Sequence, residues 1–261
     1  MEMNFRYFIL FLILFLFMNC GGHSINMEED LTPNFNKAVN FFNKGKYSRA
    51  RDEFEYIIMT DPGSGLANDS QYYKGESLFH MKEYDEAWST FDRYVRFAND
   101  INKIEKSRYR ICECAINLTN SYHRDQKQTD RALSQLQMFI EDFPLSNLNQ
   151  QAEEAISGLR LKLAKKDFEV GRLYLKLDEY ESALIYFRSI LNNYYDTGIS
   201  DDARIGIIFT HILNDNHQGA KNYLNSEQNR FLSSDKYEQA ETLLNDTKEG
   251  LKLAHYYQLY K

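Results

Sequence analysis

The fold is decided by a short stretch, Glu179-Tyr180-Glu181-Ser182-Ala183-Leu184-Ile185-Tyr186-Phe187, in which a small residue lies between two aromatic rings at helical spacing. The same order of Tyr, Ala and Phe returns in Lys46–Phe54 and in Glu83–Phe91. Residues three and four apart share one face of an α-helix. A small residue on that face lets a second helix approach closely, and the ring one turn later fills the space beside it. The stretch therefore predicts pairs of closely packed antiparallel helices.

Weaker copies of the pattern bring the number of such alanines to five. Their spacings along the chain are 37, 45, 51 and 37 residues, for Ala50, Ala87, Ala132, Ala183 and Ala220. The spacing resembles the tetratricopeptide repeat, a helix pair of about 34 residues, with insertions in the middle repeats. Gly75 and Gly171 occupy the matching small positions of two first helices. The sequence thus predicts an all-α tetratricopeptide-repeat solenoid of about five helix pairs over residues 31–230.

The individual helices follow from hydrophobic periodicity and capping residues. They are expected near residues 32–44, 48–60, 68–81, 84–97, 103–122, 129–141, 148–176, 180–194, 201–213, 217–229 and 235–258. The stretch 148–176 contains no Pro, so we expect one long helix that connects repeats three and four. Residues 231–261 are expected to hold a C-terminal capping helix, because a stack of repeats must cover its last apolar face.

The composition excludes several classes of protein. The 261 residues are 43% hydrophobic and 15% aromatic, with only 12 Gly and 3 Pro, which argues against disorder and against most all-β folds. The formal net charge is −7, and no segment concentrates Lys or Arg. We therefore expect no nucleic-acid partner, since that would require a basic surface for the phosphates.

No catalytic, metal or cofactor motif is recognisable. The six histidines form no HExxH motif and no pair at i,i+4. Cys112 and Cys114 lie two apart in a predicted helix, so they point to different faces and are expected to be free, buried thiols. A binding role is therefore expected instead of an enzymatic one, with no cofactor.

The amino end carries an apolar run, Tyr7–Met18, followed by Asn19 and Cys20. Twelve apolar residues extend only about 18 Å as a helix, whereas a bilayer core needs about 20 residues, so the run is typical of a signal peptide. The end of the run resembles a lipoprotein signal. This resemblance implies a lipoprotein signal peptide over residues 1–19 and acylation of Cys20, for example with palmitate. Residues 20–30 are then expected to form a flexible tether. Gly21 after the cysteine favours the outer membrane. An uncleaved anchor or an ordinary secretory signal is the alternative.

Two further stretches lie outside the general repeat pattern. The first is Arg124-Asp125-Gln126, followed by Ala132 and by Phe143-Pro144-Leu145-Ser146, and the second runs from Leu159 to Tyr174. Both resemble the BamD family, lipoproteins of the outer-membrane β-barrel assembly (BAM) complex. The resemblance covers residues 30–225.

The resemblance implies a lipid-anchored protein of the outer membrane that faces the periplasm. It implies docking to the barrel-forming (BamA-like) insertase subunit, association with other assembly lipoproteins and help in receiving unfolded outer-membrane protein segments. A tetratricopeptide lipoprotein of pilus assembly or of cell-wall coordination in the envelope is the alternative.

Candidate binding residues fall into two sets. The repeat register places peptide-groove candidates on the first helices of repeats one and two, with packing between repeats as the alternative for each: Phe35, Val39, Phe42, Tyr72, Glu76 and Phe79. The resemblance implies partner-interface candidates at Arg124, Asp125, Tyr186 and Arg188. Arg188 lies two positions after the site where the family carries an interface Arg, a turn of about 200° on a helix.

Overall fold

The computed structural model describes residues 30–248, and every regular element in this range is a helix. The elements in chain order are α2 (Thr32–Asn43), α3 (Tyr47–Thr60), α4 (Gly65–His80), α5 (Tyr84–Phe97), α6 (Ile101–Asn117), α7 (Lys127–Asp142), α8 (Asn149–Lys176), α9 (Tyr180–Asn193), α10 (Ile199–Leu213), α11 (His217–Glu227), the 3-10 helix η1 (Gln228–Arg230) and α12 (Ser234–Lys248). The expected signal peptide, Cys20 and the end of the closing helix lie outside the described residues.

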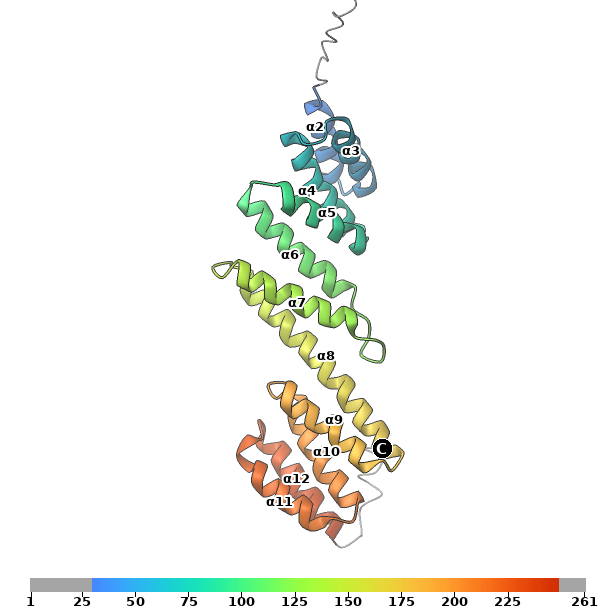
Figure 1. Cartoon of the computed structure of the whole chain (residues 1–261), viewed down its shortest axis with the longest axis vertical. Helices are drawn as coiled ribbons and strands as arrows, with labels where there is room; N and C mark the ends of the chain where they lie inside the picture. The colour runs from blue at the N-terminus through green and yellow to red at the C-terminus, as the bar shows by residue number, and fades with distance from the viewer. Residues whose placement is uncertain (1–29, 249–261) are drawn as a thin grey trace, which may run out of the picture.

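Successive helices pack against one another in chain order and form an elongated stack, with α2 at one end and α11 and α12 at the other (Figure 1). The 28-residue helix α8 belongs to two repeats at once. It packs against α7 and, further along, against α9 and α10. One continuous helix therefore joins two groups of helix pairs. This arrangement confirms the all-α tetratricopeptide solenoid and the long connecting helix.

Small residues at the helix crossings explain the close packing. The repeat alanines Ala50, Ala87, Ala132, Ala183 and Ala220 have no exposed surface. A Cβ atom added to Gly75 would lie 2.7 Å from the Phe91 ring, and one added to Gly171 would lie 2.8 Å from the Phe187 ring. These glycines therefore make room for the aromatic ring that follows the repeat alanine, so glycine, alanine and ring form one packing unit.

The helix expected at 103–122 is shorter than predicted, because α6 ends at Asn117. The side-chain amide of Asn117 donates to the carbonyl of Glu113, and the hydroxyl of Thr119 donates to the carbonyl of Ile116 at 2.8 Å. Polar side chains that bond nearby backbone groups compete with further helical hydrogen bonds. Residues 118–126 therefore form a loop between α6 and α7.

The last repeat is joined to α12 by buried charges. Asp201, with 2% of its surface exposed, accepts hydrogen bonds from the backbone N–H groups of Leu232 and Ser233 at 2.9–3.0 Å. The buried guanidinium of Arg204 lies 3.1 Å from Asp201 and 3.2 Å from Glu227. A carboxylate thus holds the start of the closing helix, where the sequence alone predicted only apolar packing.

None of the helices in residues 30–248 combines the length and apolar character needed to cross a bilayer. Within the same residues, no cluster of His, Cys, Asp and Glu side chains is arranged to hold a metal ion.

Candidate functional site

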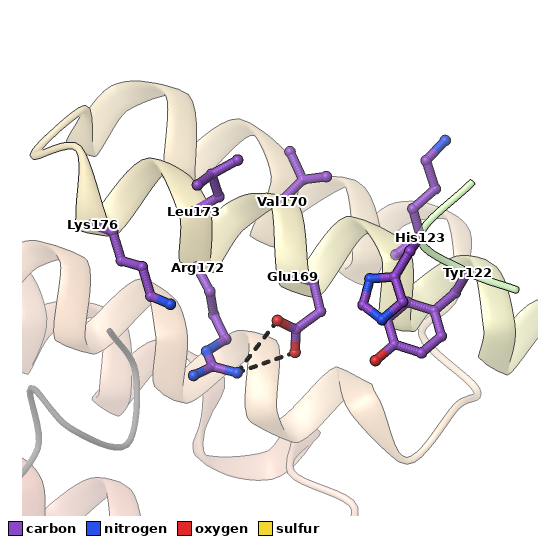
Figure 2. Close-up of a pocket in the computed structure, with 8 residues that line it drawn as sticks. Tyr122, His123, Glu169, Val170, Arg172, Leu173 and Lys176 are labelled. Atoms are coloured by element: carbon purple, nitrogen blue, oxygen red, sulfur yellow. Dashed lines mark hydrogen bonds and ion pairs between the residues drawn. The ribbon is translucent and has the colours of Figure 1, made fainter. Parts of the chain in front are cut away.

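A groove runs along the second half of α8, beside the loop that precedes α7 (Figure 2). Its volume is about 330 Å³, and we call it the α8 groove. Tyr122 and His123 lie at one end and Lys176 at the other, with the Glu169–Arg172 ion pair between them. Its lining is Tyr122, His123, Lys166, Glu169, Val170, Arg172, Leu173 and Lys176.

Helical spacing explains why these residues meet. Lys166, Val170, Leu173 and Lys176 follow one another at steps of three or four, so they lie on one face of α8. The opposite face holds the buried Gly171 and Leu175, which face the helices of repeat four. The long helix therefore presents one face to the core and the other to the groove.

The groove combines positive charge with apolar surface. Three cations, Lys166, Arg172 and Lys176, line it with a single acid, Glu169, whose carboxylate lies 3.1 Å from the Arg172 guanidinium. Leu173 supplies apolar area with 53% of its surface exposed. The whole protein is acidic, with a net charge of −7, whereas the residues that line this groove include more cations than acids. The chemistry fits a partner segment that carries carboxylates beside an apolar side chain.

Hydrogen bonds fix the loop that forms one end of the groove. The buried side chain of Gln126 donates to the carbonyls of Ser121 and Arg124, both at 2.8 Å, and accepts from the Thr129 hydroxyl at 2.7 Å. From α8, the ammonium of Lys162 donates to the Thr119 hydroxyl at 2.7 Å. Burial lowers the pKa of this ammonium. Gln126, part of the Arg124-Asp125-Gln126 stretch that resembles the family, thus stabilises the loop that carries Tyr122 and His123.

The four partner-interface candidates lie on different surfaces. Arg124 and Asp125 are exposed in the loop, and the Asp125 carboxylate accepts from the N–H of Lys127 at 3.0 Å. Tyr186 is half-buried and stacks on Tyr174, with ring centroids 5.5 Å apart. Arg188 is exposed and lines a separate cavity of about 570 Å³ together with two further arginines, Arg204 and Arg230. The α8 groove includes none of these four candidates.

The peptide-groove candidates of repeat one fill space between helices. Phe35, Val39 and Phe42 pack on a cluster of Ala38, Ala50 and Phe54. The Phe35 and Phe54 rings are 5.8 Å apart, and Phe42 contacts Tyr73 at 5.6 Å. These three side chains therefore pack between the helices of the first repeats, as the alternative for each of them stated, because the apolar faces of α2, α3 and α4 are buried against one another.

The three peptide-groove candidates of repeat two lie in different surroundings. Phe79 packs against the core cluster of its repeat, and the Arg110 guanidinium lies 4.5 Å from its ring. Tyr72 and Glu76 line a cavity of about 400 Å³. The nearly buried Glu76 carboxylate is held by two hydrogen bonds from Arg110, at 2.9 and 3.0 Å. Glu76 is thus already neutralised within the protein, and Tyr72 and Glu76 are the two of the six candidates that line this cavity.

Sequence reasoning missed the α8 groove, although it singled out the segment from Leu159 to Tyr174. A signal for the groove was present, because Val170 and Leu173 lie off the apolar face that contains Phe168, Gly171 and Leu175.

The thiols of Cys112 and Cys114 are free and buried as predicted, and burial raises the pKa of both to about 12.

Comparison with known proteins identifies the family. Residues 27–206 match the YfiO family, described as outer membrane lipoprotein. The outer membrane protein assembly factor BamD of Rickettsia prowazekii is 24% identical over 189 residues, 72% of this chain and 75% of the relative. That of Caulobacter vibrioides is 23% identical over 211 residues, 81% of this chain and 68% of the relative.

A search of solved structures matched YrrB, described as a tetratricopeptide-repeat (TPR) protein with an unusual peptide-binding site. That match has a TM-score of 0.35 and 18% identity, and covers 83% of this chain and 94% of the other. The two BamD relatives confirm the resemblance drawn from Arg124-Asp125-Gln126 and the Leu159–Tyr174 segment. Because the family match spans more than half of the chain, the chain belongs to the YfiO family of outer membrane lipoproteins.

Proposed function

We propose that the chain is a scaffold of outer-membrane β-barrel assembly that docks to the barrel-forming subunit of the complex. Two relatives named as outer membrane protein assembly factors support this role over the pilus or cell-wall alternative. The single observation that carries the proposal is the α8 groove, a cationic and apolar surface formed mainly by one of the two segments that resemble the family. Binding and positioning of partners, without a catalytic step, is the proposed activity.

A lipid on Cys20 is proposed to hold the protein at the outer membrane with its repeats in the periplasm. The family description as outer membrane lipoprotein supports this placement. The apolar run before Cys20 and the polar residues after it support acylation at this cysteine. The tether of residues 20–30 would then connect the lipid to α2.

Docking through the α8 groove depends on a rigid surface. One helix supplies six of the eight lining residues, and the loop that supplies the other two is hydrogen-bonded to the same helix through Lys162. A partner segment with acidic and apolar side chains would meet Lys166, Lys176 and Leu173 with little rearrangement. Other assembly lipoproteins and unfolded outer-membrane protein segments would use further surfaces, including the Tyr72–Glu76 cavity and the surface around Arg188.

Charge reversal in the groove tests this proposal. The double substitution Lys166→Glu and Lys176→Glu is expected to lower co-purification of the barrel-forming subunit from solubilised envelopes by about tenfold or more, since it places like charges opposite a carboxylate-bearing partner. The matched control is Lys46→Glu, a charge reversal at an exposed residue of repeat one. Equal capture by the control and the double variant, at equal protein levels, would refute docking through the groove.

A further inference from the structure

Exposed apolar side chains gather at one edge of the first repeats. Met59, Phe97 and Ile101 have 73%, 68% and 72% of their surface exposed. They lie at the last turn of α3, at the end of α5 and at the start of α6. Pro62, in the connection after α3, lines a cavity of about 550 Å³ together with Phe97. We call Met59, Pro62, Phe97 and Ile101 the anchor-side edge.

The antiparallel order of the helices brings these residues to a common edge. Phe35 of α2 contacts Phe54 of α3, so the start of α2 lies beside the end of α3. The ammonium of Lys103, in the first turn of α6, lies 2.6 Å from Asp69 in the second turn of α4. The starts of α2, α4 and α6 and the ends of α3 and α5 therefore lie on the same side of the stack.

The chain that leads to the proposed lipid enters at this edge. Leu31, directly before α2, is buried at the start of the helix. Eleven peptide steps separate Leu31 from Cys20, which can span at most about 40 Å even when extended. A lipid on Cys20 would thus hold the edge close to the bilayer at high effective concentration.

We propose that the anchor-side edge contacts the lipid bilayer in which Cys20 is anchored, with Phe97 and Ile101 inserted at the level of the headgroups. The inference rests on the proposed lipid anchor. Moving exposed aromatic rings and aliphatic side chains from water into this region lowers the free energy of the system. Two cations near the edge pair with acids of the protein, Arg96 with Asp92 and Lys103 with Asp69, and Arg93 lines the same cavity as Phe97. The edge itself consists of apolar side chains, so apolar insertion, which salt does not weaken, is the mode of contact.

Fluorescence quenching by lipid tests the contact directly. The chain from Cys20 onward is coupled through the Cys20 thiol to maleimide-headgroup lipid in phosphatidylcholine vesicles with brominated acyl chains. Coupling is selective because Cys112 and Cys114 are buried thiols. Two variants are compared, Phe97→Trp at the edge and Leu177→Trp as the control, since Leu177 is 60% exposed at the turn after α8, on the opposite side of the stack. Trp88, the single native tryptophan, gives the background emission.

The expected result is that Phe97→Trp loses most of the emission that the substitution adds, at low and at high salt, whereas Leu177→Trp loses none. Equal quenching at both positions, or none at Phe97→Trp, would overturn the proposal. A third variant, Ile101→Trp, repeats the test at the next helix in case Phe97→Trp disturbs the fold. Chemical coupling supplies the lipid whether or not cells acylate Cys20, so failure of the proposed anchor is detected separately, by the mass of the protein isolated from membranes.

Discussion

Single small residues decide how closely the helices of this protein approach. Ala183 has no exposed surface, and the Phe187 ring lies against both Gly171 of α8 and Gly206 of α10, where added Cβ atoms would come within 2.8 and 2.9 Å of it. One ring is therefore enclosed by two glycines from different helices. The sequence pattern predicted the first glycine, whereas Gly206 belongs to the next repeat and only the stacking of repeats reveals its role.

Overpacking at this crossing gives the first prediction. Ala183→Leu adds a branched side chain where no space is free, so we expect it to lower the free energy of unfolding by about 1–3 kcal/mol. The control Glu181→Ala changes an exposed residue two positions earlier and is expected to cost less than about 0.5 kcal/mol. Thermal or urea unfolding followed by circular dichroism measures both. Similar losses for the two variants would contradict the packing register.

At the scale of elements, the sequence predicted the existence of most helices and missed features that depend on side-chain hydrogen bonds. The long helix expected at 148–176 is α8, Asn149–Lys176, because uninterrupted apolar periodicity is a local property. The expected helix 103–122 was too long, since its end depends on bonds from Asn117 and Thr119 to backbone carbonyls. The α8 groove needs that loop, so a site formed by both could not be read from helical periodicity.

The attachment of α12 depends on one buried carboxylate, which gives a prediction for this element. Asp201→Ala removes three hydrogen bonds to the backbone N–H groups of Leu232 and Ser233 and leaves Arg204 with Glu227 alone. We expect this substitution to lower the free energy of unfolding by about 1.5–3 kcal/mol or more, because the lost hydrogen bonds involve a buried charge. Faster hydrogen–deuterium exchange in residues 231–248 is the measurement that locates the effect.

The neighbouring residue supplies the control. Asp202 is partly exposed and pairs with Lys236 at 2.7 Å, so Asp202→Ala is expected to cost less than about 1 kcal/mol. If both variants changed exchange in α12 equally, the buried carboxylate would not be the attachment point.

At the scale of the whole molecule, the stack separates its surfaces along its length. The anchor-side edge lies on α3, α5 and α6 near the α2 end, whereas the α8 groove lies in the half that continues into α9 and α10 (Figure 1). The proposed bilayer contact thus involves the first repeats, and the groove lies further along the stack. The long helix α8 connects the two groups of repeats and carries the groove on the side opposite Gly171 and Leu175. Under the two proposals, membrane contact and partner docking therefore belong to different repeats.

The central claim is that the α8 groove contacts the barrel-forming subunit, and site-specific photo-crosslinking in living cells tests it most directly. A photoreactive benzoyl-phenylalanine replaces Leu173, whose side chain is exposed in the groove, and a second variant carries it at the exposed Tyr56 of repeat one as the control. The account predicts an adduct between the Leu173 probe and the barrel-forming subunit, identified by mass spectrometry, with none from the Tyr56 probe. No such adduct from Leu173, or an adduct with a pilus or cell-wall protein in its place, would contradict the account.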